Sequence, residues 1–418
     1  MSETPVSETE DDQQRTVLVL GAVAMALAPV AVYAPLGTVV LLVLTLAAQP
    51  CWDRTMAALR WWFTRSRLVF IGTLLTLWAT VTLFWSPVGR PLSLPSVAIV
   101  PVIGLLLLAA VRQLKTPAAA TVARMAMYGG LLMLSLLALE VFSKGAVLRF
   151  VVPASPANLA FDQTASVVEA ASRGIAVLAP LSFVYATLIY VRTGKILASA
   201  GFVAAVFAVG FSTSMDAGWA AVAVGTLAFA VGLKAPRFAL AGLFTGLMIY
   251  AALAPVIHGQ LITLKHFHDF STRAMLGTET RIGIWQYAAQ LIGEKPLFGH
   301  GFDSTRELAK VAPLIPGTKY PALPLHTHNG FLQIWLELGV VGIGVVIVFM
   351  AFALRALWPL TKTPIYLAIT IATITATMLI FLVSFGVWQH WWIATWFLVS
   401  AQLLLALRVL HRTRFTRV

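Results

Sequence analysis

Runs of apolar residues recur along almost the whole 418-residue chain, and this pattern limits most strongly how the chain can fold. A helix of about 20 apolar residues is long enough to span the hydrocarbon core of a bilayer. The chain is 59% hydrophobic and only 11% charged, whereas a soluble domain is about a quarter charged. We therefore predict an all-α polytopic membrane protein.

Twelve transmembrane helices fit these apolar runs, nine before a long polar segment and three after it. The run from Val17 to Ala48 is too long for a single span, and Pro35 and Gly37 offer a break within it. The expected spans are residues 15–31, 34–48, 67–86, 95–111, 122–142, 165–190, 196–213, 217–233, 238–256, 328–354, 363–383 and 387–408.

The distribution of Lys and Arg over the short loops predicts the orientation of these spans. With twelve spans, one set of loops holds Arg54, Arg60, Arg65, Arg67, Arg112, Lys115, Arg124, Arg192, Lys195, Lys234, Arg237, Arg355 and Lys362. The opposite short loops hold only Arg90, Lys144 and Arg149. The positive-inside rule then places both termini in the cytoplasm. Most of the formal net charge of +13 is thus a topology signal, which argues against a nucleic-acid partner.

The spans divide the chain into five parts. The expected parts are a disordered cytoplasmic tail (1–14), nine spans (15–256), a polar segment (257–327), three spans (328–408) and a basic cytoplasmic tail (409–418). The acidic start of the chain lacks the basic region of a signal peptide, so we expect the first helix to be an uncleaved anchor. Membrane lipids are therefore among the expected partners.

The polar segment 257–327 lies on the non-cytoplasmic side and is too regular in pattern to be a linker. Apolar residues with helical spacing predict an amphipathic helix over 279–294. Asp303 or Ser304 could begin a second short helix that runs to Lys310. Four prolines then make a stiff connection to the tenth span. We expect this segment to lie over the outer membrane surface as a lid.

Polar side chains continue from the end of this segment into the tenth span. His328 stands at the mouth of the span, two residues after His326, and a histidine there can accept a proton from a hydroxyl near neutral pH. Asn329, Gln333 and Glu337 recur every four residues and so form one stripe. Such a stripe faces a bundle interior or a water-filled cavity. Hydrogen bonding between helices is the alternative role for Gln333 and Glu337.

Three arginines could serve an anionic ligand on the same face. Arg173 lies inside the sixth span, where an arginine costs roughly 2.5–3.5 kcal/mol at the centre. Glu169 stands four residues earlier, so an ion pair within the helix is the alternative reading. Arg281 and Arg306 lie on the two helices expected in the outer segment. Three converging guanidinium groups would suit a phosphate or pyrophosphate.

Other kinds of site are disfavoured. Asp216, in the outer turn between the seventh and eighth spans, reads as a helix cap. His266 and His268 lack a supporting carboxylate pattern, and the lone Cys51 excludes a cysteine metal cage, so we expect no metal and no other cofactor. Glycine-rich phosphate loops and a Gly-x-Ser-x-Gly motif are absent from the sequence. Any donor substrate must therefore carry its own activation.

Two stretches resemble the O-antigen ligase family, which belongs to the O-antigen ligase/polymerase superfamily. The first runs from His326 to Gly339 and the second joins Arg281-Ile-Gly-Ile-Trp285, Glu294-Lys-Pro-Leu-Phe-Gly-His-Gly301 and Ser304-Thr-Arg306. This resemblance implies a GT-C-like glycosyltransferase of the bacterial inner membrane whose active site is periplasmic. It would be metal-independent and inverting. It would move an O-antigen polysaccharide from undecaprenyl pyrophosphate to a sugar hydroxyl of lipid A-core, in lipopolysaccharide biosynthesis.

The resemblance also implies roles for individual residues. His328 would be the catalytic base, and Arg281 and Arg306 would hold the pyrophosphate with help from Arg173. Asn329, Gln333, Glu337, His326 and Asp216 would support them. Some superfamily members carry an arginine in the outer turn where this chain has Met215 and Asp216, so the role of that turn stays open.

Three alternatives differ from an O-antigen ligase. The related O-antigen polymerase and a protein O-oligosaccharyltransferase belong to the same superfamily. A transporter of lipid-linked glycans would place the arginines along a headgroup path. Many transporters show two similar halves, and the sequence contains no convincing internal repeat.

Overall fold

The computed structural model describes residues 10–49, 52–151, 163–213, 215–262 and 276–415. The chain forms a bundle of helices, and the one β pairing among the described residues is an isolated bridge between Leu314 and Pro321. The helices are α1 Glu10–Tyr33, α2 Thr38–Leu44, α3 Trp52–Arg65, α4 Arg67–Thr82, α5 Leu94–Ala98, α6 Val100–Gln113, α7 Thr116–Phe142, α8 Leu148–Val151, α9 Gln163–Thr193, α10 Ile196–Phe211, α11 Asp216–Lys234, α12 Pro236–Val256, α14 Leu276–Glu294, α15 Thr305–Leu308, α16 Gly330–Leu357, α17 Pro364–Val383 and α18 His390–Phe415.

Nine helices within the described ranges are long and apolar enough to cross a membrane. Three shorter apolar helices, Pro35–Ala48, Arg67–Thr82 and Ile196–Phe211, coincide with the second, third and seventh expected spans. An all-helical polytopic membrane protein is therefore confirmed. The count of twelve spans and the GT-C-like description stay predictions.

Several helix ends differ from the sequence-based boundaries. Helix α1 begins at Glu10 rather than at residue 15, because the acidic residues of its first turn are stabilised at a helix N-terminus. Helix α18 continues to Phe415, beyond the expected end at residue 408. Residues 52–65 form α3 rather than a loop. Residues 1–9 of the expected N-terminal tail lie outside the described residues.

Small residues let the central helices approach closely, as is common between membrane helices. A Cβ at Gly129 of α7 would lie 2.4 Å from the carbonyl oxygen of Ala24 in α1. At the neighbouring Gly130 it would lie 2.4 Å from the ring of Tyr185 in α9. Helix α9 is the most enclosed of the candidate spans, and it contacts α7, α10, α17 and α18.

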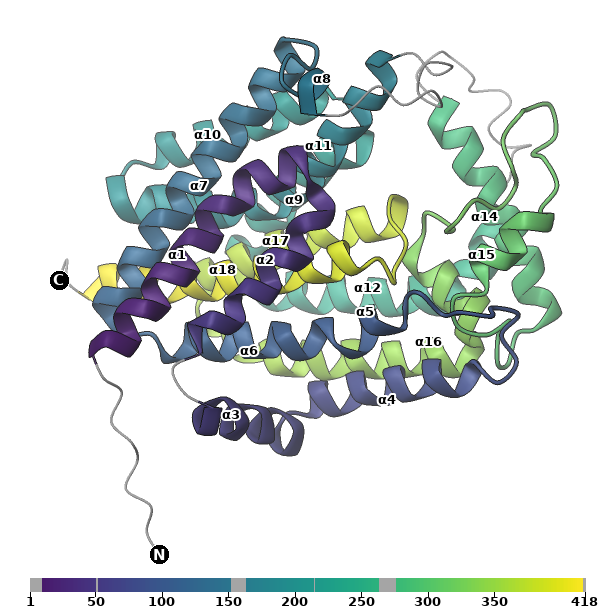
Figure 1. Cartoon of the computed structure of the whole chain (residues 1–418), viewed down its shortest axis with the longest axis horizontal. Coiled ribbons are helices and arrows are strands. Elements are labelled where there is room, and N and C mark those ends of the chain that lie inside the picture. The colour runs from purple at the N-terminus through teal and green to yellow at the C-terminus, as the bar shows by residue number, and fades with distance from the viewer. Residues whose placement is uncertain (1–9, 50–51, 152–162, 214, 263–275, 416–418) are drawn as a thin grey trace, which may run out of the picture.

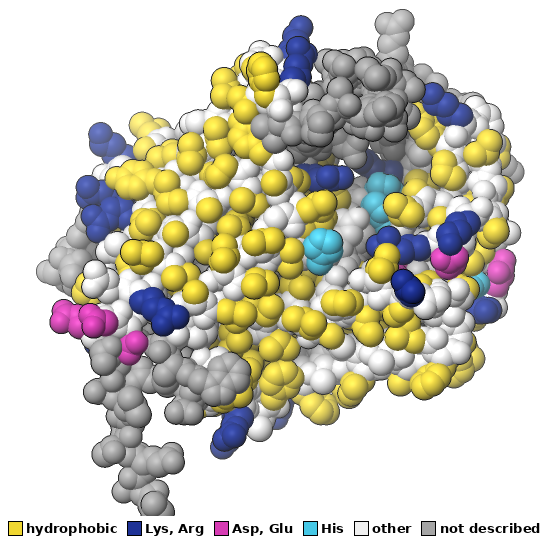
Figure 2. All heavy atoms as spheres, viewed as in Figure 1, with side chains coloured by type: hydrophobic (Ala, Val, Ile, Leu, Met, Phe, Trp, Pro, Cys, Tyr) yellow, Lys and Arg dark blue, Asp and Glu magenta, His cyan; other side chains and the backbone are white. Residues whose placement is uncertain are grey.

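The segment that contains α14 and α15 covers one end of this bundle. Figure 1 shows it at the right, beyond the ends of α12 and α16, whereas α1 begins and α18 ends at the left. Figure 2 shows hydrophobic side chains over the middle of the same face, with Lys and Arg gathered towards its two ends and histidines near the right-hand group. The start of α1 and the end of α18 therefore lie at the opposite end of the bundle from the α14–α15 segment.

Candidate functional site

The candidate site is centred on the residues that precede α16. Asn329 is the N-cap of this helix, and its side-chain oxygen accepts hydrogen bonds from the backbone N–H groups of Phe331 and Leu332, each at 3.1 Å. The expected span began at residue 328, but the helix begins at Gly330. His328 is therefore outside the helix, with a left-handed φ of 54° that turns the chain into the cap.

His326 and His328 meet at a single backbone oxygen. The carbonyl oxygen of Ser384, in the turn between α17 and α18, lies 2.6 Å from His328 Nδ1 and 3.2 Å from His326 Nε2. The two ring centroids are 4.2 Å apart. A carbonyl oxygen only accepts, so both of these ring nitrogens must carry protons. Neutral His328 then has its lone pair on Nε2, where it can accept a proton.

Burial keeps both histidines neutral. Desolvation, with smaller contributions from His326 and Arg281, lowers the pKa of His328 to about 3 although its hydrogen bond to Ser384 acts in the opposite direction. Desolvation, assisted by Arg306, likewise lowers the pKa of His326 to about 4. Arg281 therefore lies near enough to affect His328 and Arg306 near enough to affect His326, so four of the expected site residues are brought together.

Two helices of the outer segment supply those arginines. Arg281 lies on α14, where burial lowers the pKa of its guanidinium and the carboxylate of Asp216 acts against this shift. Arg306 lies on α15 and is part-exposed, with its Nε 2.9 Å from Asp303 Oδ1. The hydroxyl of Ser93 donates to the same carboxylate oxygen at 2.9 Å. Asp303 therefore fixes Arg306 relative to the turn between α4 and α5.

Asp216 differs from the expected helix cap. Met215 is the N-cap of α11 and makes no side-chain capping bond, whereas Asp216 is the first helical residue and accepts from Trp219 Nε1 at 3.3 Å. Its carboxylate lies close enough to affect Arg281. No local sequence pattern indicates this proximity, because 65 positions separate the two residues along the chain.

Arg173 is placed at the same end of the bundle but is not shown in contact with the histidines. It is half-buried on α9, two residues before Ile175, whose side chain packs beside Gly210 and Gly218 at the turn between α10 and α11. Its role in ligand binding stays a prediction. The side chain of Glu169, the alternative partner, lies outside the described residues.

The expected polar stripe is buried and joins three parts of the chain. Gln333 donates to Glu337 Oε1 at 3.1 Å and accepts from the backbone N–H of Val387 at 3.0 Å. Glu337 Oε1 also accepts from Thr305 Oγ1 at 2.5 Å. Its Oε2 accepts from Trp388 Nε1 at 2.6 Å and from the Asp303 N–H at 2.7 Å. Hydrogen bonding between elements, the alternative role weighed for this stripe, is thus what the two side chains do.

Glycines allow the outer segment to lie directly on α16. Gly339 has a left-handed φ of 66°, and a Cβ there would lie 2.3 Å from the carbonyl oxygen of Leu297. Gly299 has a φ of 70°, and a Cβ there would lie 2.5 Å from the backbone of Glu337. His300 N–H donates to the carbonyl oxygen of Leu336 at 2.8 Å. These contacts place α15, and with it Arg306, next to the start of α16.

Tyr250 and His258 complete the surroundings of Asn329, and neither was expected from the sequence. Asn329 Nδ2 donates to the Tyr250 hydroxyl at 2.6 Å, and this hydroxyl lies 2.7 Å from His258 Nε2. Trp285 of α14 donates to the carbonyl oxygen of Thr327 at 3.0 Å. Among the described residues no three His, Cys, Asp or Glu side chains converge as metal ligands. His266 and His268 lie outside the described residues.

The family model and the known proteins that match this chain carry consistent descriptions. Residues 209–347 match the family model described as O-antigen ligase, and this region holds every expected site residue except Arg173. A protein of Rickettsia bellii named "Putative polysaccharide ligase" is 34% identical over 168 residues, which are 39% of this chain and 40% of that protein. A relative in Rickettsia conorii with the same description is 32% identical over 169 residues, 39% of each chain.

A longer match exists to a "Putative polysaccharide ligase" of Rickettsia typhi, which is 27% identical over 243 residues, 56% of this chain and 58% of that protein. The chain thus spans less than two thirds of the length of these relatives. The region that the family model matches contains the motifs around the two histidines and around Arg281 and Arg306. Residues 209–347 of this chain are therefore similar to the O-antigen ligase family.

Proposed function

We propose that this chain is an O-antigen ligase of the bacterial inner membrane. It transfers a polysaccharide from undecaprenyl pyrophosphate to a sugar hydroxyl of lipid A-core on the periplasmic face, and it needs no metal. The observation that carries this proposal is the histidine pair at the Ser384 oxygen, where Arg281 acts on His328, Arg306 acts on His326, and Nε2 of His328 is an acceptor. This arrangement supplies both an anion site and a base.

The reaction divides between these groups. The acceptor oxygen attacks the anomeric carbon of the donor sugar from the face opposite the leaving group, and its proton passes to His328 Nε2. The bond between this carbon and the pyrophosphate oxygen breaks, so undecaprenyl pyrophosphate leaves with the electron pair and the configuration inverts. Arg281 and Arg306 stabilise the charge that develops on the leaving oxygen.

Donor binding also prepares the base. In the free protein, burial, with smaller contributions from His326 and Arg281, lowers the pKa of His328 to about 3, which makes it a weak base. A bound pyrophosphate would neutralise the arginines and bring negative charge close to the ring, so it would raise this pKa. Proton transfer to His328 is then favoured in the complex that contains the activated donor.

Reconstitution provides the direct test. Purified protein, undecaprenyl-linked donor and lipid A-core are combined in vesicles, and the product is separated by gel electrophoresis. We expect transfer with the wild-type chain, also in the presence of a chelator. Loss of transfer on chelation would contradict the metal-free mechanism.

A deletion strain distinguishes the ligase from its relatives. Loss of a ligase leaves unsubstituted core and long polymer on the undecaprenyl carrier, whereas loss of a polymerase leaves core with a single repeat. Loss of a transporter would leave the lipid-linked glycan on the cytoplasmic face. Normal lipopolysaccharide together with unglycosylated protein would instead indicate a protein O-oligosaccharyltransferase.

A further inference from the structure

Helix α14 presents a second functional face. Arg281 and Trp285 are four residues apart and share one side of the helix. Gly283, Gln286 and Gln290 lie on the other side, which borders a cavity of about 860 Å³. This volume falls within the range of about 300–1,000 Å³ that is common for small-molecule sites. Most of the cavity lining on α14 therefore lies on a different side of the helix from Arg281.

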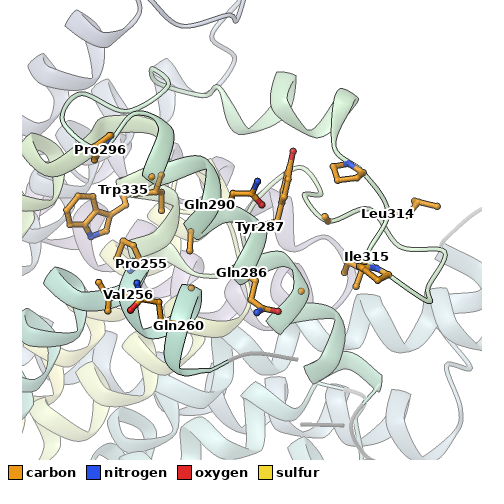
Figure 3. A pocket seen from close by; sticks show the side chains of 18 of the residues that line it. Pro255, Val256, Gln260, Gln286, Tyr287, Gln290, Pro296, Leu314, Ile315 and Trp335 are labelled. Atoms are coloured by element: carbon orange, nitrogen blue, oxygen red, sulfur yellow. The ribbon is translucent and has the colours of Figure 1, made fainter. Parts of the chain in front are cut away.

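Besides α14, the walls of this cavity come from the end of α12 with the π-helix after it, from α16 and from the proline-rich segment. Gln260 comes from the π-helix Ile257–Leu261 that follows α12, and Trp335 comes from the second turn of α16. The proline-rich segment that includes Leu314 and Ile315 closes the far side. Figure 3 shows the amides of Gln260, Gln286 and Gln290 and the ring of Tyr287 around the space.

The chemistry of this lining points to an uncharged ligand. None of the described residues that line the cavity carries a charge. An anionic headgroup or pyrophosphate would find no cation there, unlike in the site beside His328. Most lining side chains are apolar, but three amides and a phenol stand among them.

We infer that this cavity binds neutral sugar residues of the glycan, at a distance from the bond that reacts. Sugar hydroxyls can exchange hydrogen bonds with water for hydrogen bonds with the three amides. Aromatic rings and prolines can cover the apolar C–H faces of the same sugars. A hydrocarbon chain would instead remove water from the amides of Gln260 and Gln290 without replacing its hydrogen bonds, which is unfavourable. The assignment of the sugars to a transferred glycan rests on the proposed function.

Gly293 makes the inference testable without disturbing the fold. It lines the cavity, and a Cβ added there would meet nothing within 4 Å. Gly293→Leu therefore fills the cavity from an exposed helix position. Gly246→Leu on α12 is a matched control, because a Cβ at Gly246 also meets nothing within 4 Å and Gly246 does not line the cavity. Gln290→Ala provides a second variant that removes one amide.

The experiment is a calorimetric titration of the purified full chain in detergent. The probe is the water-soluble glycan released from the undecaprenyl-linked donor by mild acid, which carries no lipid and no pyrophosphate. We expect binding to the wild type, Gly246→Leu and His328→Ala. We expect no measurable binding to Gly293→Leu and a weakening of up to about tenfold for Gln290→Ala, the effect of one lost hydrogen bond.

The outcomes separate this inference from the proposed function. Absence of binding to the wild type, equal binding to Gly293→Leu, or displacement of the glycan by free undecaprenol would overturn the sugar subsite. None of these results depends on catalysis. Conversely, if the glycan binds as expected but the reconstituted protein transfers nothing, the subsite stands and the ligase proposal fails.

Discussion

At the scale of single residues, the proposed proton transfer depends on the tautomer of His328. The carbonyl oxygen of Ser384 fixes the proton on Nδ1 and leaves Nε2 as the acceptor. His328→Ala removes that base, and we expect a fall in transfer rate of about 10²–10⁴-fold, which is typical for loss of a general base. Donor binding should change little, because the arginines remain.

His326→Asn is the matched comparison for His328→Ala. His326 shares the Ser384 oxygen but is held there through Nε2, so its substitution should slow transfer less than loss of His328. Initial rates with saturating donor measure both effects. Equal losses in the two variants would contradict the assignment of the base to His328.

The arginines are expected to act through guanidinium geometry as well as charge. Arg281→Lys keeps the charge but cannot form a planar bidentate contact, so we expect the KM for the donor to rise and kcat to fall. Arg237→Lys is the control. Arg237 lies at the start of α12, whereas the site lies near the other end of that helix, so this variant should behave as the wild type. Donor-dependent rates in detergent measure both, and unchanged kinetics for Arg281→Lys would remove this residue from the site.

The pH dependence follows from the pKa values of the two histidines. The folded values of about 3 and about 4 lie below the ordinary 6.5, so between these values the unfolded chain binds more protons. The stabilising contribution of the neutral rings is therefore complete above pH 6.5 and is lost as the pH falls towards 4. We expect the Tm in detergent to fall over this range in the wild type, and to fall less in a His326→Asn, His328→Asn double variant. An equally steep fall in the double variant would contradict burial of neutral histidines.

At the scale of structural elements, the contact between α16 and the outer segment holds the site together. Gly339→Ala forces a side chain into the carbonyl of Leu297 and retains a left-handed φ, so we expect a loss of about 1–3 kcal/mol or more. Gly344→Ala, on the same helix with nothing within 4 Å, should be neutral or slightly stabilising. Thermal denaturation in detergent compares the two, and equal Tm values would contradict the close contact.

The sequence predicted these elements better than it predicted their contacts. Apolar runs located α4 and α16 to within a few residues, because burial in a bilayer leaves a long and simple pattern, and the amphipathic spacing of α14 located that helix equally well. The polar stripe on α16 was also evident from its four-residue spacing. By contrast, Ser384 participates through its backbone carbonyl, and the relation between Asp216 and Arg281 depends on packing. Neither leaves a trace in local sequence.

At the scale of the whole molecule, the site lies at the opposite end of the bundle from the start of α1 and the end of α18, the end with the termini (Figure 1). The positive-inside rule predicts that the end with the termini is cytoplasmic. We therefore expect a single cysteine at Lys319, in a Cys51→Ser background, to react with an impermeant maleimide in intact spheroplasts. A cysteine at Arg412 should react only after lysis. The reverse pattern would place the histidines on the cytoplasmic side, where the proposed reaction could not use periplasmic substrates.

In the proposed mechanism, His328 takes the acceptor proton while the pyrophosphate of the bound donor raises the pKa of His328. The most direct measurement is the pH dependence of reconstituted transfer, recorded as kcat/KM for the donor and as kcat with saturating donor. We expect the acid limb of kcat to lie at higher pH than the acid limb of kcat/KM. The reason is that kcat reports the pKa of His328 in the donor complex, whereas kcat/KM reports it in the free protein. We also expect His328→Ala to lack this acid limb. Identical acid limbs of kcat and kcat/KM, or an unchanged acid limb in His328→Ala, would contradict this mechanism.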